Sequence, residues 1–153
     1  MVENTLVILN VLGLCVLLGG GIYESVVINP NYRSNLPQSL DHIRQFFKVR
    51  TPASLFRIAS PATMLSLGLT VIVCWGLLPA RWWFVTALAA LIVADSITYG
   101  FHYPRNKILF IDPLSSDIAK LERLAREWAK GNLVRIVLMI VAVVSMLCGI
   151  ISS

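Results

Sequence analysis

The stretch at residues 5–29, TLVILNVLGLCVLLGGGIYESVVIN, decides the class of fold. It is apolar over more than the roughly 20 residues that a helix needs to cross the hydrocarbon core of a bilayer. Three further stretches, at 60–78, 82–101 and 133–151, qualify in the same way. Of the 153 residues, 57% are hydrophobic and 14% are charged, whereas soluble domains carry about 25% charged residues. The sequence therefore predicts one all-α domain over 1–153, an integral membrane bundle of four transmembrane helices.

Prolines mark the predicted ends of these spans. Pro30, Pro79 and Pro104 follow the first, second and third spans, and the residue before a proline disfavours the helical region. Pro61 falls in the first turn of the second span, where its missing N–H costs little.

Both long connections are predicted to contain helix of their own. At 40–49, Ile43 and Phe47 alternate with Arg44 and Lys48, which is typical of a short helix lying in the membrane interface. In the second connection, Asp117 lies in a helix-start signature followed by apolar residues at steps of three and four. This pattern predicts a cytoplasmic extension over 117–132 that runs unbroken into the fourth span.

The basic residues predict the orientation. Of the 13 Lys and Arg residues, only Arg81 lies between the second and third spans; Arg135 lies just inside the fourth, and the rest lie in the two long loops. Basic residues collect in cytoplasmic loops, so both long loops should be cytoplasmic and both termini outside, in a bacterial inner membrane. This orientation accounts for the net charge of +5, and no nucleic-acid partner is expected.

The first span carries a carboxylate, Glu24, near its end. Glu24 shares a helical face with Gly13 and Gly20, and small residues mark contacts between membrane helices. We therefore expect Glu24 to face other helices rather than lipid, where a charge costs about 2.5 kcal/mol or more.

Polar residues on two other spans should lie at the same depth as Glu24. They form one stripe on each span: Asp95, Tyr99 and His102 on the third, and Trp128, Asn132 and Arg135 on the fourth. Two interpretations are open. The cluster is a functional site, as intramembrane ionisable residues are by default, or it is an ion-pair network that only fixes helix register.

No metal site is expected. Together, His102, Asp95 and Glu24 would offer one histidine and two carboxylates, whereas the facial triad of non-haem iron has two histidines and one carboxylate. Di-iron sites in bundles use Glu-x-x-His pairs on two helices, and the sequence contains none. No other cofactor is expected either.

Three stretches resemble a family of small four-helix membrane proteins that includes the anthrone oxygenases, much of it described only as a domain of unknown function. They are GGGIYESVVINPNY (19–32), TYGFHYPRNKILF (98–110) and LERLAREWAKGNLVR (121–135). The best-matched features are Trp128 with Asn132 and Arg135, and the Pro-x-Asn element formed by Pro104 and Asn106.

The resemblance implies a cofactor-free oxygenase that acts on a lipophilic aromatic or quinone-like molecule. Such a reaction needs a base, donors for an oxyanion and a site shielded from water. His102 or Glu24 would be the base, Asn132 and Arg135 would hold the enolate oxygen, and the substrate would be bound by Trp128, Asp95, Tyr99 and Asn106.

The alternative is a non-catalytic membrane protein that binds lipid or serves as a subunit of a larger assembly. An enzyme should have a pocket of a few hundred cubic ångströms beside the charged cluster, whereas a purely structural cluster should form closed salt bridges. A channel is disfavoured because four short helices enclose little pore unless the chain forms a homo-oligomer, which the sequence leaves open.

Overall fold

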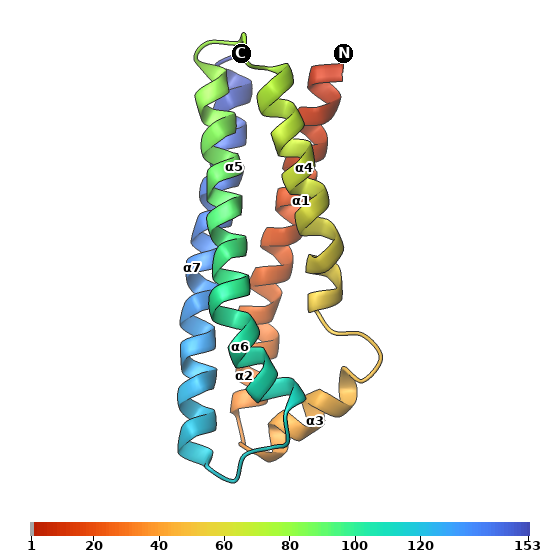
Figure 1. The fold of residues 1–153 in the computed structure, drawn as a ribbon, viewed down its shortest axis with the longest axis vertical. Helices are drawn as coiled ribbons and strands as arrows, with labels where there is room; N and C mark the ends of the chain where they lie inside the picture. The colour runs from red at the N-terminus through yellow and green to blue at the C-terminus, as the bar shows by residue number, and fades with distance from the viewer. Residues whose placement is uncertain (1) are drawn as a thin grey trace.

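The computed structural model describes residues 2–153, with side chains from residue 5 onward. Its long helices are α1 (Val2–Tyr23), α4 (Ala53–Val73), α5 (Ala80–Ile97) and α7 (Ile118–Ile151), which lie side by side (Figure 1). Among the described residues, four helical segments are long and apolar enough to cross a membrane: Thr5–Arg33, Ala53–Val73, Ala80–Ile111 and Ile118–Ile151. The predicted four-helix membrane bundle is confirmed.

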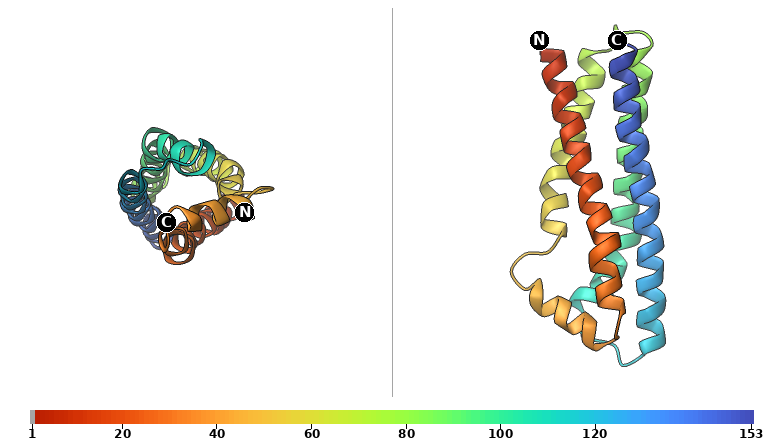
Figure 2. Two further views of the ribbon diagram at one scale, coloured as in Figure 1. Left: turned by 90° about the horizontal axis from the view of Figure 1, so that it is seen from below. Right: turned by 180° about the vertical axis from the view of Figure 1, so that it is seen from behind.

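Each long helix packs against two others. Helices α1 and α5 both pack against α4 and α7, and the view along the bundle shows the resulting ring (Figure 2). Both termini lie at one end of the bundle, and α3 (Gln38–Phe46) lies at the other (Figure 1). We call this second end the long-loop end. Between the helices, the core is built mainly from Leu, Ala and Met side chains, among them Leu14, Leu67, Leu91, Met139 and Met146.

Three π-helical turns each precede a proline by the same spacing. They are η1 (Glu24–Ile28), η2 (Thr98–His102) and η3 (Lys107–Ile111), and Pro30, Pro104 and Pro113 each stand six positions after the first residue of a turn. Proline has no N–H, and its ring clashes with the carbonyl four residues earlier. The wider π turn accommodates this clash and keeps the preceding N–H bonded: that of Asn29, for example, reaches the Glu24 carbonyl.

Two of the helix ends predicted from proline are wrong, because the π turns let the helix continue. The chain continues past Pro30 as α2 (Asn29–Arg33) and past Pro104 as α6 (Tyr103–Asn106), instead of ending its helix at residue 29 or 101. Helix α4 begins at Ala53 rather than at residue 60, so that Pro61 lies inside the helix, and it ends at Val73 rather than at residue 78.

The two helices expected in the long connections are present. The short one, expected at 40–49, is α3 (Gln38–Phe46). The extension expected from residue 117 is the first part of α7, which runs without a break from Ile118. Asp117 caps this helix, because its carboxylate accepts a hydrogen bond of 2.9 Å from the Lys120 backbone N–H.

Helix α3 is fastened to the end of η3 by Arg44. Its guanidinium donates hydrogen bonds to the carbonyl groups of Leu109 (2.6 Å and 2.8 Å), Asp112 (2.8 Å) and Ile108 (3.2 Å). A cation at a helix C-terminus is favourable. Burial lowers the pKa of Arg44, and the carboxylates of Asp41 and Asp112 oppose that change. Arg44 is therefore only half-exposed, and its guanidinium binds the protein itself.

Close packing of α7 on α5 predicts a strong response at Gly149. A Cβ atom there would clash with the Phe84 ring, and overpacking of this kind costs about 1–3 kcal/mol. We expect Gly149→Ala to lower the thermal unfolding temperature in detergent. Gly68→Ala is the matched control, since nothing lies within 4 Å of the Cβ it would add. An equal response of the two variants would contradict the packing described.

Candidate functional site

Two neighbouring cavities lie at the long-loop end of the bundle. The smaller has a volume of about 50 Å³, and the larger has a volume of about 380 Å³. Six residues line both of them: Glu24, Ala53, Arg57, Tyr103, Asn106 and Trp128. The cavities therefore share a wall, and groups on that wall can act on a molecule in either one.

The small cavity collects most of the polar residues that the sequence singled out. Of the candidate residues it is lined by Glu24, Asp95, Tyr99, His102, Asn106, Trp128 and Arg135. They come from η1, α5, η2, α6 and α7, so that segments far apart in the sequence meet at one depth. Asn132 lines neither cavity.

Asn132 joins α7 to the first span. It is fully buried, and its amide donates hydrogen bonds to the Gly21 carbonyl (3.1 Å) and the Ser25 hydroxyl (2.9 Å). Its carbonyl oxygen accepts a hydrogen bond of 3.3 Å from Arg135. Because these partners occupy the amide, Asn132 acts on the cavity through Arg135 rather than by direct contact.

Arg135 is buried without a closed ion pair. Its guanidinium lies over the Phe56 ring, 5.2 Å from the centroid, and its Nε has no hydrogen-bond partner among the residues that the structure describes. Among the side chains of residues 5–153, no carboxylate lies within 4.0 Å of it. A buried cation without a counter-ion favours an anionic or oxygen-bearing ligand.

Glu24 is the carboxylate on the shared wall. It is only 8% exposed, and it lines both cavities. No cationic nitrogen of a described side chain lies within 4.0 Å of it. Glu24 and Arg135 thus face one space from separate helices without neutralising each other in a direct pair.

His102 is also buried and has both ring nitrogens uncommitted. It is 1% exposed, and neither nitrogen has a hydrogen-bond partner among the described residues. The Gly131 backbone lies beside the ring but lacks the geometry of a hydrogen bond. The ring meets Trp128 edge to face, with centroids 5.0 Å apart. A buried imidazole in this state can accept or donate a proton in the cavity.

Trp128 is held in place by Asn106. The indole Nε1 donates a hydrogen bond of 2.7 Å to the Asn106 side-chain oxygen. Tyr32, which is fully buried, also meets the indole edge to face, with centroids 6.3 Å apart. Trp128 therefore forms a rigid aromatic part of the shared wall.

The remaining two candidates lie at the edge of the small cavity. Asp95 accepts a hydrogen bond of 2.5 Å from the Ser60 hydroxyl, which links α5 to α4. Tyr99 lines the cavity but is 63% exposed and packs on Tyr103 at 5.1 Å. Its position suits the rim of an opening more than the interior of a site.

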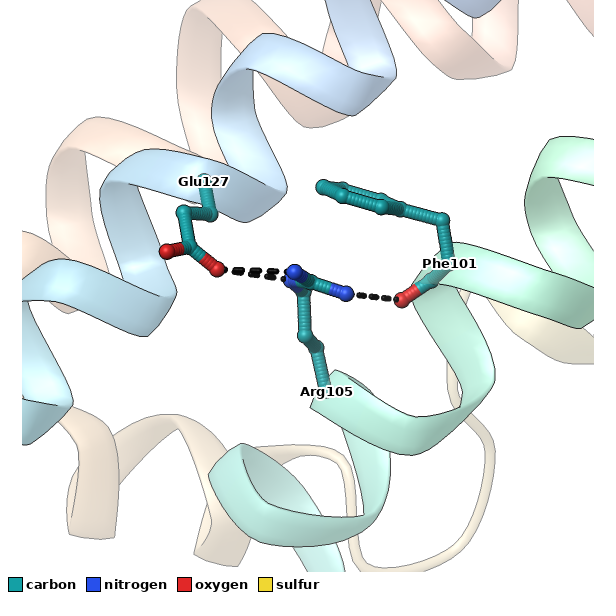
Figure 3. A network of polar contacts seen from close by, with 3 residues as sticks. All are labelled: Phe101, Arg105 and Glu127. Atoms are coloured by element: carbon teal, nitrogen blue, oxygen red, sulfur yellow. Dashed lines mark hydrogen bonds and ion pairs between the residues drawn. The ribbon is translucent and has the colours of Figure 1, made fainter.

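Arg105 fixes the turn that carries His102 (Figure 3). Its Nε and Nη2 donate hydrogen bonds to the Glu127 carboxylate at 3.1 Å and 2.8 Å. Nη1 donates to the Phe101 carbonyl at 3.0 Å, and the guanidinium lies 3.5 Å from the Phe101 ring centroid. This contact fastens η2 to α7 immediately before His102. Gly131 permits the close approach, because a Cβ there would lie 2.5 Å from the Phe101 ring.

A family model described as anthrone oxygenase matches residues 52–145, which is more than half of the chain. The chain belongs to the anthrone oxygenase family. No match was found among curated proteins or among solved structures.

The match to the anthrone oxygenase family covers only part of the site. Residues 52–145 include His102, Trp128, Asn132 and Arg135 but not Glu24. The family match therefore supports a functional role only for the residues on the segment from α4 to α7. A role for Glu24 is supported instead by its burial and by its position in the linings of both cavities.

The sequence analysis did not identify three residues that contribute to this site. Ser25 binds Asn132, Tyr32 packs on Trp128, and Arg44 holds α3 against the large cavity. Tyr32 was missed because Pro30 predicted that the helix ends before it, whereas the helix continues past Pro30 and buries Tyr32. Nothing in the sequence indicated that Ser25 is a partner.

The arrangement of the His, Cys, Asp and Glu side chains bears on whether the site can hold a metal ion. Among the described residues, no group of three or more His, Cys, Asp or Glu side chains is arranged to hold a metal ion. The site is therefore characterised by a carboxylate, an imidazole and a guanidinium around a cavity.

The hydrogen bonds of Asn132 predict a large loss of stability in Asn132→Ala. Three hydrogen bonds disappear, two of them buried and one partly buried, so that Gly21, Ser25 and Arg135 each lose a partner. An unsatisfied buried group costs about 1–3 kcal/mol. Thermal unfolding in detergent measures this loss. The control is Asn31→Ala, whose exposed amide donates only to the Val27 carbonyl. A melting temperature as little changed as in the control would contradict the assigned bonding.

Proposed function

We propose that this anthrone oxygenase family member is a membrane-embedded, cofactor-free oxygenase of lipophilic aromatic compounds with an acidic ring C–H. The ring system binds in the large cavity, whose 380 Å³ is within the range for small-molecule sites. Its reacting edge lies at the wall shared with the small cavity, beside Glu24 and Trp128.

Glu24 is the base in this proposal. A C–H group that lies across the ring from a ketone carbonyl loses its proton to the Glu24 carboxylate. The electron pair of the C–H bond is delocalised onto the carbonyl oxygen, which gives a phenolate. Arg135 stabilises the developing negative charge on that oxygen, as preorganised donors do in other enzymes. Burial of the site away from water strengthens both interactions.

The electron-rich carbanion then reduces dioxygen. One electron passes to O₂, the radical pair recombines to form a C–O bond, and protonation gives a hydroperoxide on the ring carbon. His102 supplies that proton. The deprotonated His102 then removes the second hydrogen of the same carbon as a proton, so that the C=O of the quinone forms as the O–O bond breaks. The proton that Glu24 took up in the first step converts the departing hydroxide into water, and both groups return to their starting states. The substrate loses two hydrogens and gains one oxygen, with one O₂ consumed.

The observation that carries the proposal is that Glu24, on the wall of a cavity of ligand size, and Arg135, in the adjoining small cavity, form no direct ion pair among the described side chains. A cluster that served only to hold helices in register would neutralise its charges in direct ion pairs, because an unpaired buried charge is unfavourable. The ion pairs at the long-loop end, Arg105–Glu127 at 2.8 Å and Arg126–Glu122 at 3.3 Å, lie outside both cavity linings.

The proposal includes the orientation in the membrane. The basic residues of the long-loop end favour a cytoplasmic position, so the substrate enters from the cytoplasmic leaflet or the adjacent interface. The exposed apolar surface of the helices then faces lipid, as in other membrane bundles.

The test is oxygen uptake by the purified protein with anthrone as substrate. Anthrone has the required CH₂ group across the ring from a carbonyl, and its expected product is anthraquinone, formed with one O₂ consumed per molecule. Uptake should exceed the spontaneous rate measured with heat-denatured protein. A rate equal to that control, for anthrone and for hydroxylated anthrones, would remove the proposal.

A further inference from the structure

The large cavity has an excess of positive charge in its lining. Its charged residues are Arg44, Arg57 and Lys107 against one carboxylate, Glu24. The donors of Arg44 are occupied by backbone carbonyls at the end of η3. Arg57 and Lys107 are different: both are exposed, and among the described side chains neither has a carboxylate within 4.0 Å.

These two cations come from different elements around the same cavity. Arg57 lies on α4, and Lys107 begins η3 after α6. Both are on the outer side of the site, whereas Glu24 is buried. The rest of the lining between them is largely apolar, with Ile28, Ile43, Phe47, Phe110 and Ile111. The cavity therefore has an apolar body, an uncommitted positive pair and a single acidic group.

We propose that the large cavity selects a lipophilic ring system that carries an anionic substituent, such as a carboxylate, and that Arg57 and Lys107 bind that substituent. This inference rests on the proposed function and names the substrate class more closely. The apolar wall accommodates the rings, while hydrogen bonds to the charged oxygens are stronger than those to a neutral group. Repulsion from Glu24 keeps the anionic end away from the base.

The charge pattern thus also orients the substrate. With the substituent at Arg57 and Lys107, on the exposed side of the cavity, the opposite edge of the rings points inward to the buried Glu24. A neutral ring system of the same size has no such preference and can bind in either direction. Arg57 and Lys107 are specificity-determining residues in this account, and they take no part in proton transfer.

A matched pair of ligands tests the inference. Anthraquinone-2-carboxylate and the neutral anthraquinone-2-carboxamide share one ring system and differ in charge. Binding is measured by quenching of tryptophan fluorescence in phosphatidylcholine nanodiscs, since Trp128 lines both cavities. We expect the carboxylate to bind about tenfold more tightly, which corresponds to about 1.4 kcal/mol, because two ionic contacts at exposed positions are each weak.

Two double variants separate cavity charge from general surface charge. R57Q/K107Q should reduce the preference to less than about twofold, chiefly by weakening the binding of the carboxylate. K48Q/R50Q removes two exposed cations outside the cavity lining and should retain the preference. Equal unfolding temperatures establish that all the variants are folded.

The outcomes distinguish this inference from the proposed function. Equal binding of the two ligands to the unmodified protein, or a preference that persists in R57Q/K107Q, overturns the inference alone. Failure of both ligands to bind overturns the proposed function as well. Loss of the preference when phosphatidylglycerol replaces a third of the lipid would assign the cations to lipid headgroups, which also overturns the inference.

Discussion

Glu24→Gln should abolish most of the oxygen uptake with anthrone while the protein remains folded. The amide cannot accept the ring proton, and loss of a general base lowers rates by about 10²–10⁴. The unfolding temperature should change little, because Glu24 forms no direct ion pair with any side chain of residues 5–153. Oxygen uptake and thermal unfolding in the same detergent measure the two effects.

Glu122→Gln is the control for Glu24→Gln, since Glu122 forms an exposed pair with Arg126 on the same helix. It should retain full activity. If Glu24 instead held Arg135 in a structural pair, Glu24→Gln would destabilise the protein by about 3–5 kcal/mol. Such destabilisation, or full activity in Glu24→Gln, would contradict the role of Glu24 as base.

Arg135→Gln should lower turnover by about 10²–10³, the effect of removing one oxyanion donor. The loss should fall on kcat more than on KM, because the negative charge on the substrate oxygen develops in the transition state. Steady-state oxygen uptake over a range of anthrone concentrations separates the two parameters.

Arg126→Gln provides the comparison for Arg135→Gln, because Arg126 is exposed and lines neither cavity. Its kinetics should match those of the unmodified protein. An Arg135→Gln variant with unchanged kcat would show that the guanidinium does not stabilise the reaction, even if the variant folds normally.

Much of the fold follows from sequence because a bilayer imposes a simple length and polarity rule. Apolar runs of about 20 residues specify the four spans, and Asp117 marks the start of α7 correctly. Proline was the source of error. A rule that ends helices at Pro30 and Pro104 ignores the π turn, which lets a helix pass a proline by moving the opposing carbonyl. The spacing shared by all three turns is visible only once the structure reveals it.

The sequence predicts the depth in the bundle at which the site lies, but it does not predict which side chains contact one another. Helical periodicity and topology predict that Glu24, His102 and Arg135 face one another near one end, because each lies on an inward stripe. Periodicity cannot predict that the Asn132 amide is occupied by Gly21 and Ser25, since that depends on sub-ångström packing of α1 on α7. The large cavity depends on α3, which lines it. Arg44 fixes α3 by donating hydrogen bonds to backbone carbonyls near the end of η3, and a sequence does not indicate where such backbone groups lie.

The most direct measurement is an experimental structure of the protein with bound anthraquinone. The account predicts ring density in the large cavity against Trp128, with one quinone oxygen directed toward Arg135 and the opposite edge beside Glu24. Anthraquinone bound elsewhere, or a Glu24 side chain turned toward the acyl chains of the lipid, would contradict the claim that Glu24 and Arg135 share one ligand site.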